Sequence, residues 1–154
     1  MERFRETEKF FALELLSGKS LGHDPGQFVI VSIPEIGEAP ISVSSSSRAD
    51  NIFELCVQAT SDVAQMLHAL HEGDIVLIRG PFGHGFDKFI MERMRGKHLL
   101  LIGYGIGYVT LRSLIQHVAP EAAYYAKVSI LCGCKQPAER LYVNELADLV
   151  CDNQ

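Results

Sequence analysis

The segment EAPISVSSSSR, residues 38–48, decides how the N-terminal half of the chain is interpreted. Ile41 and Val43 alternate with Ser42 and Ser44, and this period of two predicts a strand. One face of that strand carries only small hydroxyl side chains, which add little packing energy. The pattern alone favours an edge strand with solvated serines, but it leaves open a face that is kept flat for a ligand.

Short apolar runs lie on both sides of this segment. They occupy 10–15, 27–33, 51–59 and 74–80, and turn signals separate them. A Gly-Pro pair predicts the end of the last run. Several short strands at this spacing predict an antiparallel barrel or sandwich.

One helix is expected within this β region. The segment SDVAQMLHALHEGD, residues 61–74, places its apolar residues at helical spacing. Ser61 or Asp62 is a suitable N-cap, and Gly73 is a suitable stop signal. The amide groups of the first turn carry partial positive charge, so this end of the helix could seat an anion.

From residue 97 the pattern changes to α/β. Residues 97–103 and 127–133 are continuous apolar runs, as expected for parallel strands that are buried on both faces. Helices are predicted over 111–119 and 137–150. This βαβα order is part of a doubly wound fold. We therefore expect two domains, residues 1–96 and residues 97–154.

Composition excludes several classes of function. The net charge is −5 and the basic residues are scattered, which argues against nucleic-acid binding. Glycines interrupt the longest apolar run, which argues against a membrane span. The charged segment MERFRETEKF differs from a signal peptide, so we expect a cytoplasmic protein. Cys132 and Cys134 form a C-x-C pair without a second pair at ligand spacing, so free thiols are favoured and no metal site is predicted.

Glycines at 103, 105 and 107 lie between an apolar run and a predicted helix. At this position bare backbone can approach a phosphate group. The spacing differs from the G-x-G-x-x-G dinucleotide motif, and no P-loop lysine follows. Tight strand–helix packing is the alternative reason for these glycines.

The ordered motifs together resemble the ferredoxin–NADP⁺ reductase superfamily. They are PGQFV, APISVSS, LHALHEGD, RGPFGHGF, LLLIGYGIGYVTLRSLI and LCGCKQPAERLYVNEL. The chain looks most like the flavin-binding electron-transfer subunits of sulfhydrogenase (its gamma subunit), anaerobic sulfite reductase and dihydroorotate dehydrogenase. The resemblance covers nearly the whole chain. It implies a β plus α/β fold: an N-terminal six-stranded antiparallel flavin-binding barrel with one helix, then a partial parallel α/β nucleotide-binding domain.

The resemblance also implies a set of site residues. Ser42 would hydrogen-bond the N5 edge of the flavin and is the expected catalytic residue. The strand around it would lie beneath the flavin ring, the 61–74 helix would bind the FAD pyrophosphate, and the glycine turn would meet NAD(P)H. The expected cofactor-binding residues are Pro40, Ile41, Ser42, Val43, Ser44, Ser61, Asp62, Val63, Gly80, Gly105, Ile106, Gly107, Thr110, Gly133 and Lys135.

Several positions depart from the pattern of that superfamily. Ala39 stands where many relatives carry an arginine that pairs with the FAD phosphate. Ser61 and Ala64 replace the usual glycine and Ser/Thr of the phosphate-binding turn. A lost charge-assisted hydrogen bond costs about 1.5–3 kcal/mol, so we expect weakened FAD binding or FMN in its place. In the glycine turn, Tyr104 could crowd the pyrophosphate, and Thr110 replaces a proline.

Only about two βα units follow residue 96, where the resemblance calls for roughly twice as many. Such a small parallel sheet leaves apolar faces and edges uncovered. Either the chain is truncated in its NAD(P)-binding domain or a second chain completes the fold, and we expect an oligomer or a complex. The predicted function is a flavin-dependent oxidoreductase subunit that passes electrons between NAD(P)H and a partner redox subunit of iron–sulfur or hydrogenase/reductase type. The alternative is a degenerate structural or regulatory subunit of a redox complex; a stand-alone flavin reductase is a third possibility.

Overall fold

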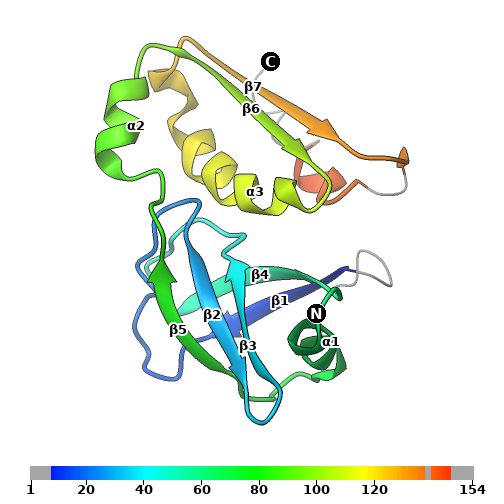
Figure 1. Ribbon diagram of the computed structural model, residues 1–154. Coiled ribbons are helices and arrows are strands. Elements are labelled where there is room, and N and C mark those ends of the chain that lie inside the picture. The colour runs from blue at the N-terminus through cyan, green and yellow to red at the C-terminus, as the bar shows by residue number, and fades with distance from the viewer. Residues whose placement is uncertain (1–7, 138–139, 147–154) are drawn as a thin grey trace.

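The computed structural model describes residues 8–137 and 140–146. A β region built from the N-terminal strands lies against an α/β region built from the C-terminal elements (Figure 1). The β pattern and the α/β pattern predicted from the sequence are therefore both present, in the predicted order.

The N-terminal region contains two small antiparallel sheets. β1 (Glu8–Glu14) pairs with β4 (Ile52–Gln58). β2 (Phe28–Ile33) lies between β3 (Gly37–Ser42) and β5 (Leu77–Phe82). The antiparallel β architecture is thus confirmed. In the described ranges it consists of five strands in two open sheets rather than six in a closed barrel.

Alternating side chains of these strands form the first core. Val29 and Val31 on β2 are fully buried, as are Phe53 and Leu55 on β4. Val43 follows β3 and makes an isolated antiparallel bridge to Leu55, which connects the two sheets. Burial alternates along β2, because residues i and i+2 point to the same side of a strand.

The predicted helix is present as α1 (Asp62–Ala69). Ser61 caps it, since its hydroxyl oxygen accepts a hydrogen bond from the amide of Ala64 at 3.3 Å. Val63 and Leu67 anchor one face of the helix in the β core. The helix ends at Leu70 instead of Gly73, because Leu70 already has extended backbone geometry.

Two features between residues 74 and 97 differ from the prediction. β5 begins at Leu77 and continues through Gly80 and Pro81 to Phe82, so the Gly-Pro pair does not end the strand. Pro81 is tolerated because β5 is an edge strand of its sheet. A short helix, α2 (Lys88–Met94), was not predicted; only its Met91 is buried, so the sequence carries no apolar periodicity there.

The α/β region has a parallel pair of strands with a helical connection. β6 (His98–Tyr104) pairs with β7 (Lys127–Gly133). Between them lie α3 (Gly107–Val118) and a 3₁₀ segment (Ala119–Tyr124). α3 begins four residues earlier than predicted, inside the glycine turn. Of the helix predicted over 137–150, residues 143–146 are helical, and 138–139 and 147–154 lie outside the described residues.

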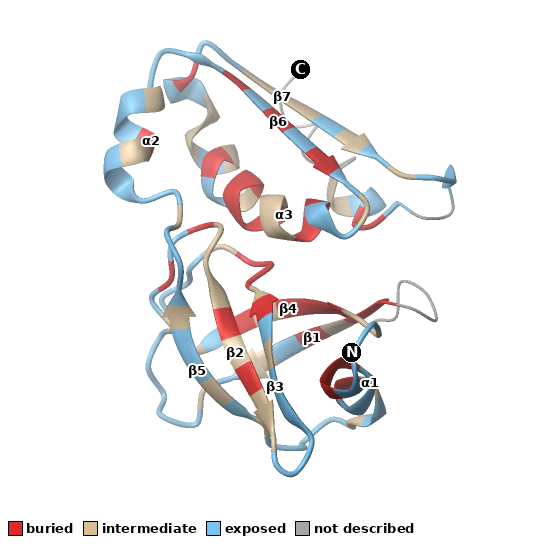
Figure 2. Cartoon of the chain, in the orientation of Figure 1, coloured by how far each residue is buried: buried red, intermediate tan, exposed pale blue. Residues whose placement is uncertain are grey.

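Burial of both faces of this sheet was predicted and is wrong for the described part of the chain. Leu99 and Leu101 pack under α3, whereas Leu100, Ile102 and Leu131 are more than half exposed. Burial alternates along β6 accordingly (Figure 2). The reason is that α3 covers one face and no described element covers the other. The expected uncovered apolar face is therefore confirmed.

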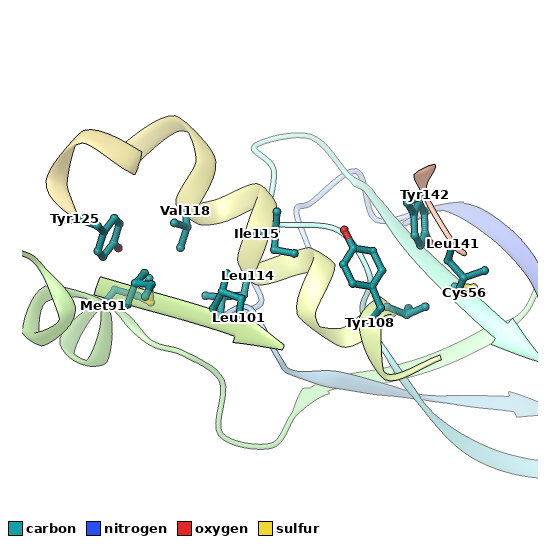
Figure 3. Packing of buried hydrophobic residues seen from close by; sticks show 12 residues of the cluster. Cys56, Met91, Leu101, Tyr108, Leu114, Ile115, Val118, Tyr125, Leu141 and Tyr142 are labelled. Atoms are coloured by element: carbon teal, nitrogen blue, oxygen red, sulfur yellow. The ribbon is translucent and has the colours of Figure 1, made fainter. Parts of the chain in front are cut away.

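A second core joins the two regions. It combines buried residues of β6 and α3 with Cys56 of β4 and with Leu141 and Tyr142 of the C-terminal segment (Figure 3). Phe10 of β1 packs against the same cluster. Within residues 8–137 and 140–146, no helix is long and apolar enough to cross a membrane.

Candidate functional site

A cleft of about 320 Å³ lies where the two regions meet. Its walls come from the end of β3, from β4 and the residues that follow it, from the start of α1, and from the start of α3. Seven of the predicted cofactor-binding residues line it: Pro40, Ile41, Ser42, Ser61, Ile106, Gly107 and Thr110. The fold thus brings together three separate motifs that the sequence analysis connected only by resemblance.

The β3 wall contributes small or apolar residues to the cleft. Pro40 is exposed and Ser42 is half-buried, whereas the side chain of Ile41 points into the β core. Ile41 therefore contributes backbone rather than a side chain. Ala39, also in the lining, keeps this wall free of charge.

The α1 wall is the start of the helix, where Ser61 and Ala64 line the cleft. The first-turn amides of Asp62 and Val63 have no acceptor within the helix, because the first four N–H groups of any helix lack one, but these two residues lie beside the lining and not in it. The Ser61 hydroxyl is already occupied as the cap. The carboxylate of Asp62 lies in the first turn, and the lining of the cleft includes no lysine or arginine. An anion bound here would therefore depend on amides and hydroxyls alone.

The α3 wall begins at the glycine turn. Gly105 has a φ of +52°, and its amide donates to the carbonyl of Gly133 at 2.9 Å, which fixes the turn to the end of β7. Ile106 precedes α3 without a side-chain cap. The Tyr104 ring lies against Gly133, where an added Cβ would meet it at 2.7 Å, and Tyr104 does not line the cleft.

The remaining predicted residues lie outside the cleft lining. Val43 and Val63 are buried in the β core, and Ser44 has no exposed surface. Gly80 lies against Val29, which an added Cβ would meet at 3.1 Å. Asp62, Gly105, Gly133 and Lys135 complete this set.

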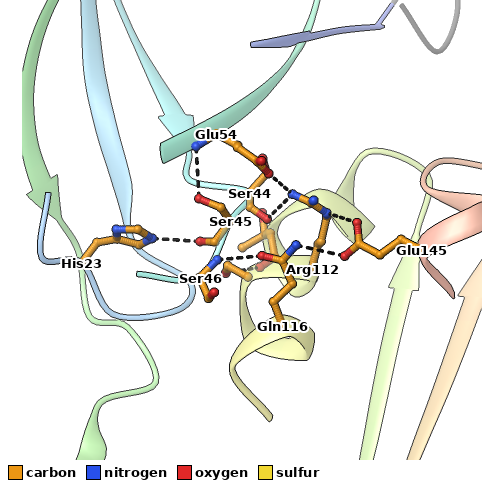
Figure 4. A network of polar contacts seen from close by, with 10 residues as sticks. His23, Ser44, Ser45, Ser46, Glu54, Arg112, Gln116 and Glu145 are labelled. Atoms are coloured by element: carbon orange, nitrogen blue, oxygen red, sulfur yellow. Dashed lines mark hydrogen bonds and ion pairs between the residues drawn. The ribbon is translucent and has the colours of Figure 1, made fainter. Parts of the chain in front are cut away.

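Ser44 and its neighbours instead belong to a polar network behind the cleft (Figure 4). The Ser44 carbonyl accepts a hydrogen bond from the Arg112 guanidinium at 3.1 Å. The Ser45 hydroxyl accepts from the Glu54 amide at 3.1 Å, and the Ser46 amide donates to the side-chain oxygen of Gln116 at 2.9 Å. The serine run thus has two roles by position: Ser42 faces the cleft, and Ser44 and Ser46 join the β region to α3.

Arg112 is the centre of this network, and sequence reasoning missed it. Its guanidinium bonds Glu54 at 2.5 Å and Glu145 at 2.7 Å, and it lies 4.3 Å from the centre of the Tyr142 ring. Burial would lower the pKa of Arg112, but the hydrogen bonds to the two carboxylates outweigh that effect and raise the pKa. One sequence signal was available: Arg112 lies three positions after Val109, on the same face of α3 as apolar residues, and a charged residue on an apolar helix face indicates a buried ion pair.

Among the described residues that line the cleft are hydroxyls and one thiol, Cys56, but no His, Asp, Glu, Lys or Arg. Burial raises the pKa of the Cys56 thiol to about 11, so this lining residue stays protonated near neutral pH. Burial also raises the pKa of Tyr108 and of Tyr142. In the part of the chain that the structure describes, no group of three or more His, Cys, Asp and Glu could hold a metal. The site can bind and orient a ligand through shape, hydroxyls and amides.

Curated proteins similar in sequence are redox-complex subunits. The gamma subunit of sulfhydrogenase 2 from Pyrococcus furiosus is 37% identical over 146 residues, which cover 93% of this chain and 49% of that protein. The electron-transfer subunit of dihydroorotate dehydrogenase B from Bacillus mycoides is 33% identical over 131 residues, which cover 82% of this chain and 49% of that protein. The chain thus spans about half the length of these relatives. No family model matches it.

Solved structures with the same fold are reductase domains. A cytochrome P450 reductase from Amycolatopsis superposes with a TM-score of 0.78 at 21% identity, covering 94% of this chain and 44% of that one. The FAD/NAD-binding domain of a Vibrio cholerae nitric oxide dioxygenase gives a TM-score of 0.74 at 22% identity, covering 95% and 64%. At this identity the likeness concerns the fold alone. The chain is therefore a homologue of sulfhydrogenase gamma subunits and dihydroorotate dehydrogenase electron-transfer subunits, with the fold of ferredoxin–NADP⁺ reductase-like domains.

Proposed function

We propose that this chain is the flavin-binding electron-transfer part of an oxidoreductase and that it passes electrons between NAD(P)H and a partner redox protein. The observation that carries the proposal is the cleft, in which Ser42, the N-terminus of α1 and the glycine turn before α3 face one space. Residues 1–96 would act as the flavin-binding β region, and residues 97–154 would form part of the nicotinamide-nucleotide domain.

The cleft residues fit a flavin in two respects. The β3 wall carries no bulky side chain toward the cleft and Ser42 supplies a hydroxyl, so a planar ring could lie close to the backbone. The first-turn amides of α1 suit a phosphate group. The charge of the cleft fits a pyrophosphate less well, because Ala39 provides no cation and Asp62 carries a negative charge. FAD bound through amides and hydroxyls is therefore our first proposal, and FMN, with a single phosphate, is the alternative cofactor.

Each wall would have a separate task in the reaction. A bound flavin supplies hydride acceptance and single-electron release, which no side chain here could provide. Ser42 would orient the ring by hydrogen bonding to its edge, and Pro40 would exclude water from its face. The α3 turn at Ile106 and Gly107 would admit the nicotinamide nucleotide on the opposite side. Site residues outside the lining, such as Lys135, would act only on more distant parts of a nucleotide.

Partners are proposed from two observations. The names of the relatives describe subunits of larger enzymes, sulfhydrogenase and dihydroorotate dehydrogenase B. The open face at Leu100, Ile102 and Leu131 is apolar and uncovered by any described element, which favours association. We propose a partner subunit that carries an iron–sulfur or hydrogenase/reductase centre.

The visible absorption spectrum of the purified full chain tests this proposal. We expect flavin bands after incubation with FAD or FMN, and bleaching of those bands when NADH or NADPH is added without oxygen. Bands that persist with both nucleotides would overturn the proposed NAD(P)H reaction and leave a flavoprotein. Riboflavin is the matched ligand that separates ring binding from phosphate binding.

The absence of a positively charged side chain among the described lining residues supports a second possible function. Because the cleft lining contains no lysine or arginine, the chain could be a structural or regulatory subunit of a redox complex that keeps the fold without nucleotide turnover. The same experiment decides between the two functions. Absence of flavin bands after reconstitution with FAD, FMN and riboflavin would favour this second function over the first.

A further inference from the structure

Arg112 connects three segments of the chain that are far apart in sequence. Its guanidinium donates to the Glu54 carboxylate on β4 at 2.5 Å and to the Ser44 carbonyl after β3 at 3.1 Å. It also donates to the Glu145 carboxylate in the C-terminal segment at 2.7 Å. The residue itself is only 6% exposed. A guanidinium is suited to this arrangement because its donors lie in one plane at fixed angles.

Two of the bonded segments, and α3 itself, are also walls of the cleft. Ser42, at the edge of the cleft, lies two residues before Ser44 on the same strand path. Cys56 lines the cleft two residues after Glu54 on β4, and Thr110 lines it two residues before Arg112 on α3. In each of these three walls, a lining residue therefore lies two residues away from Arg112 itself or from a residue that Arg112 bonds.

The surroundings of Arg112 hold its plane in one orientation. The centre of the Tyr142 ring is 4.3 Å from the guanidinium carbon, and that of the Phe10 ring is 5.7 Å from it. Gln116, one turn further along α3, donates to the second oxygen of Glu145 at 3.0 Å. With two carboxylates, a carbonyl and two rings around it, the side chain is fixed on several sides. A lysine could replace the charge but not the set of directed bonds.

We infer that Arg112 is a positioning residue: it sets the separation between the Ser42 strand and the glycine turn of α3, and thereby between flavin and nicotinamide nucleotide. The effect on catalysis rests on the proposed function. The bonds of Arg112 that hold the cleft walls together are a property of the chain alone. Hydride transfer needs the reacting atoms about 3–3.5 Å apart, and a displacement of about 1 Å costs roughly 10²-fold in rate. Loss of the directed bonds should therefore slow transfer much more than it weakens flavin binding.

The first test needs no cofactor. Hydrogen exchange of the full chain, followed by mass spectrometry, is compared for wild type, Arg112→Lys and Arg112→Gln. We expect exchange in residues 42–46 and in the first turn of α3 to rise by about tenfold or more, while β2 stays unchanged. Unchanged exchange in those segments, or a uniform rise throughout the chain, would overturn the inference. If Arg112→Gln fails to fold, Arg112→Lys carries the test, because it keeps the charge.

The second test measures the reaction. In single-turnover reduction by saturating NADH or NADPH, we expect Arg112→Lys to lower the limiting rate by about 10²-fold. We expect its dissociation constant for flavin to stay within about threefold, because Arg112 is not one of the residues that line the cleft. An unchanged limiting rate would overturn the inference. If the wild type binds no flavin, the proposed function fails, and hydrogen exchange alone decides the role of Arg112.

Arg95 provides a control arginine with a similar set of partners at an exposed position. It also pairs with two glutamates, Glu92 at 3.1 Å and Glu121 at 3.7 Å, and lies 4.2 Å from the Tyr124 ring. It does not line the cleft. Arg95→Lys should leave both the exchange of residues 42–46 and the reduction rate as in the wild type. Equal effects of the two substitutions would mean that loss of any such arginine loosens the fold, and the inference would be wrong.

Discussion

Replacement of Ser42 measures how closely a ligand lies against the β3 wall. Ser42 is half-buried and lines the cleft, and it pairs with Phe28 in the β2–β3 register. Ser42→Ala removes a hydroxyl with little change of shape, so only a hydrogen bond to flavin is lost. That loss costs about 0.5–1.5 kcal/mol, which corresponds to a roughly 2- to 13-fold weaker dissociation constant.

Ser42→Leu adds a steric effect to the same loss. Excess volume at a close-packed contact costs about 1–3 kcal/mol further, so the combined weakening should be roughly 10- to 10³-fold. The β region should stay folded, because the side chain points into the cleft rather than into the core. Flavin affinity is measured by the change in flavin fluorescence on titration with protein, and folding by thermal unfolding.

Ser47→Leu is the control for this series. Ser47 is exposed, belongs to the same serine run and does not line the cleft, so this change should leave the dissociation constant within about twofold. The reasoning would be refuted if Ser42→Leu bound flavin as tightly as the wild type. It would also be refuted if Ser47→Leu weakened binding equally.

Three further predictions use paired changes. Ala39→Arg adds a cation to the cleft lining, so flavin titration should show FAD bound roughly 10- to 100-fold more tightly and the affinity for riboflavin unchanged. Equal tightening for both ligands would contradict an interaction of this arginine with the FAD phosphates. Gly103→Ala should lower the free energy of unfolding by about 1–3 kcal/mol in urea titration, because a Cβ there meets the α3 backbone at 2.9 Å. Gly107→Ala is the control and should not lower it, since a Cβ there meets nothing within 4 Å; similar losses in both variants would argue against this packing. In the same titration, Leu101→Ala should lower the free energy of unfolding by about 2–5 kcal/mol, because Leu101 is only 8% exposed. Ile102→Thr should lower it by less than about 0.5 kcal/mol, because Ile102 is 65% exposed; a large loss of stability in this variant would show that this face is covered in solution.

The sequence predicted the elements with strong patterns and missed those without them. β2 and the start of α1 were predicted nearly residue for residue, because alternation and helical spacing are strong there and Ser61 is a clear cap. The end of α1 was not, since the helix stops at Ala69, before the predicted stop at Gly73. α2 was missed because one buried residue in seven leaves no periodicity. Local signals also misplaced the end of β5, where an edge strand tolerates Pro81.

The site was predicted in part for a similar reason. Motif order was enough to bring Ser42, Ser61 and Gly107 together, because each lies at the end of an element that the fold directs to one place. It could not distinguish Ser42 from Ser44, since both lie on the same strand face and only the packing of α3 separates their roles. The partners of Arg112 are 33 to 68 residues away in sequence, so no local pattern could identify them.

The core shared by the two regions limits how this fold can be recombined. Phe10 and Cys56 come from the β region, yet they pack with residues of α3 and with Tyr142. A graft of the α/β half from another reductase would have to supply an apolar surface that matches both, together with a cation for Glu54. The boundary near residue 96 is thus a change of architecture along the chain and not a line along which modules can be exchanged freely.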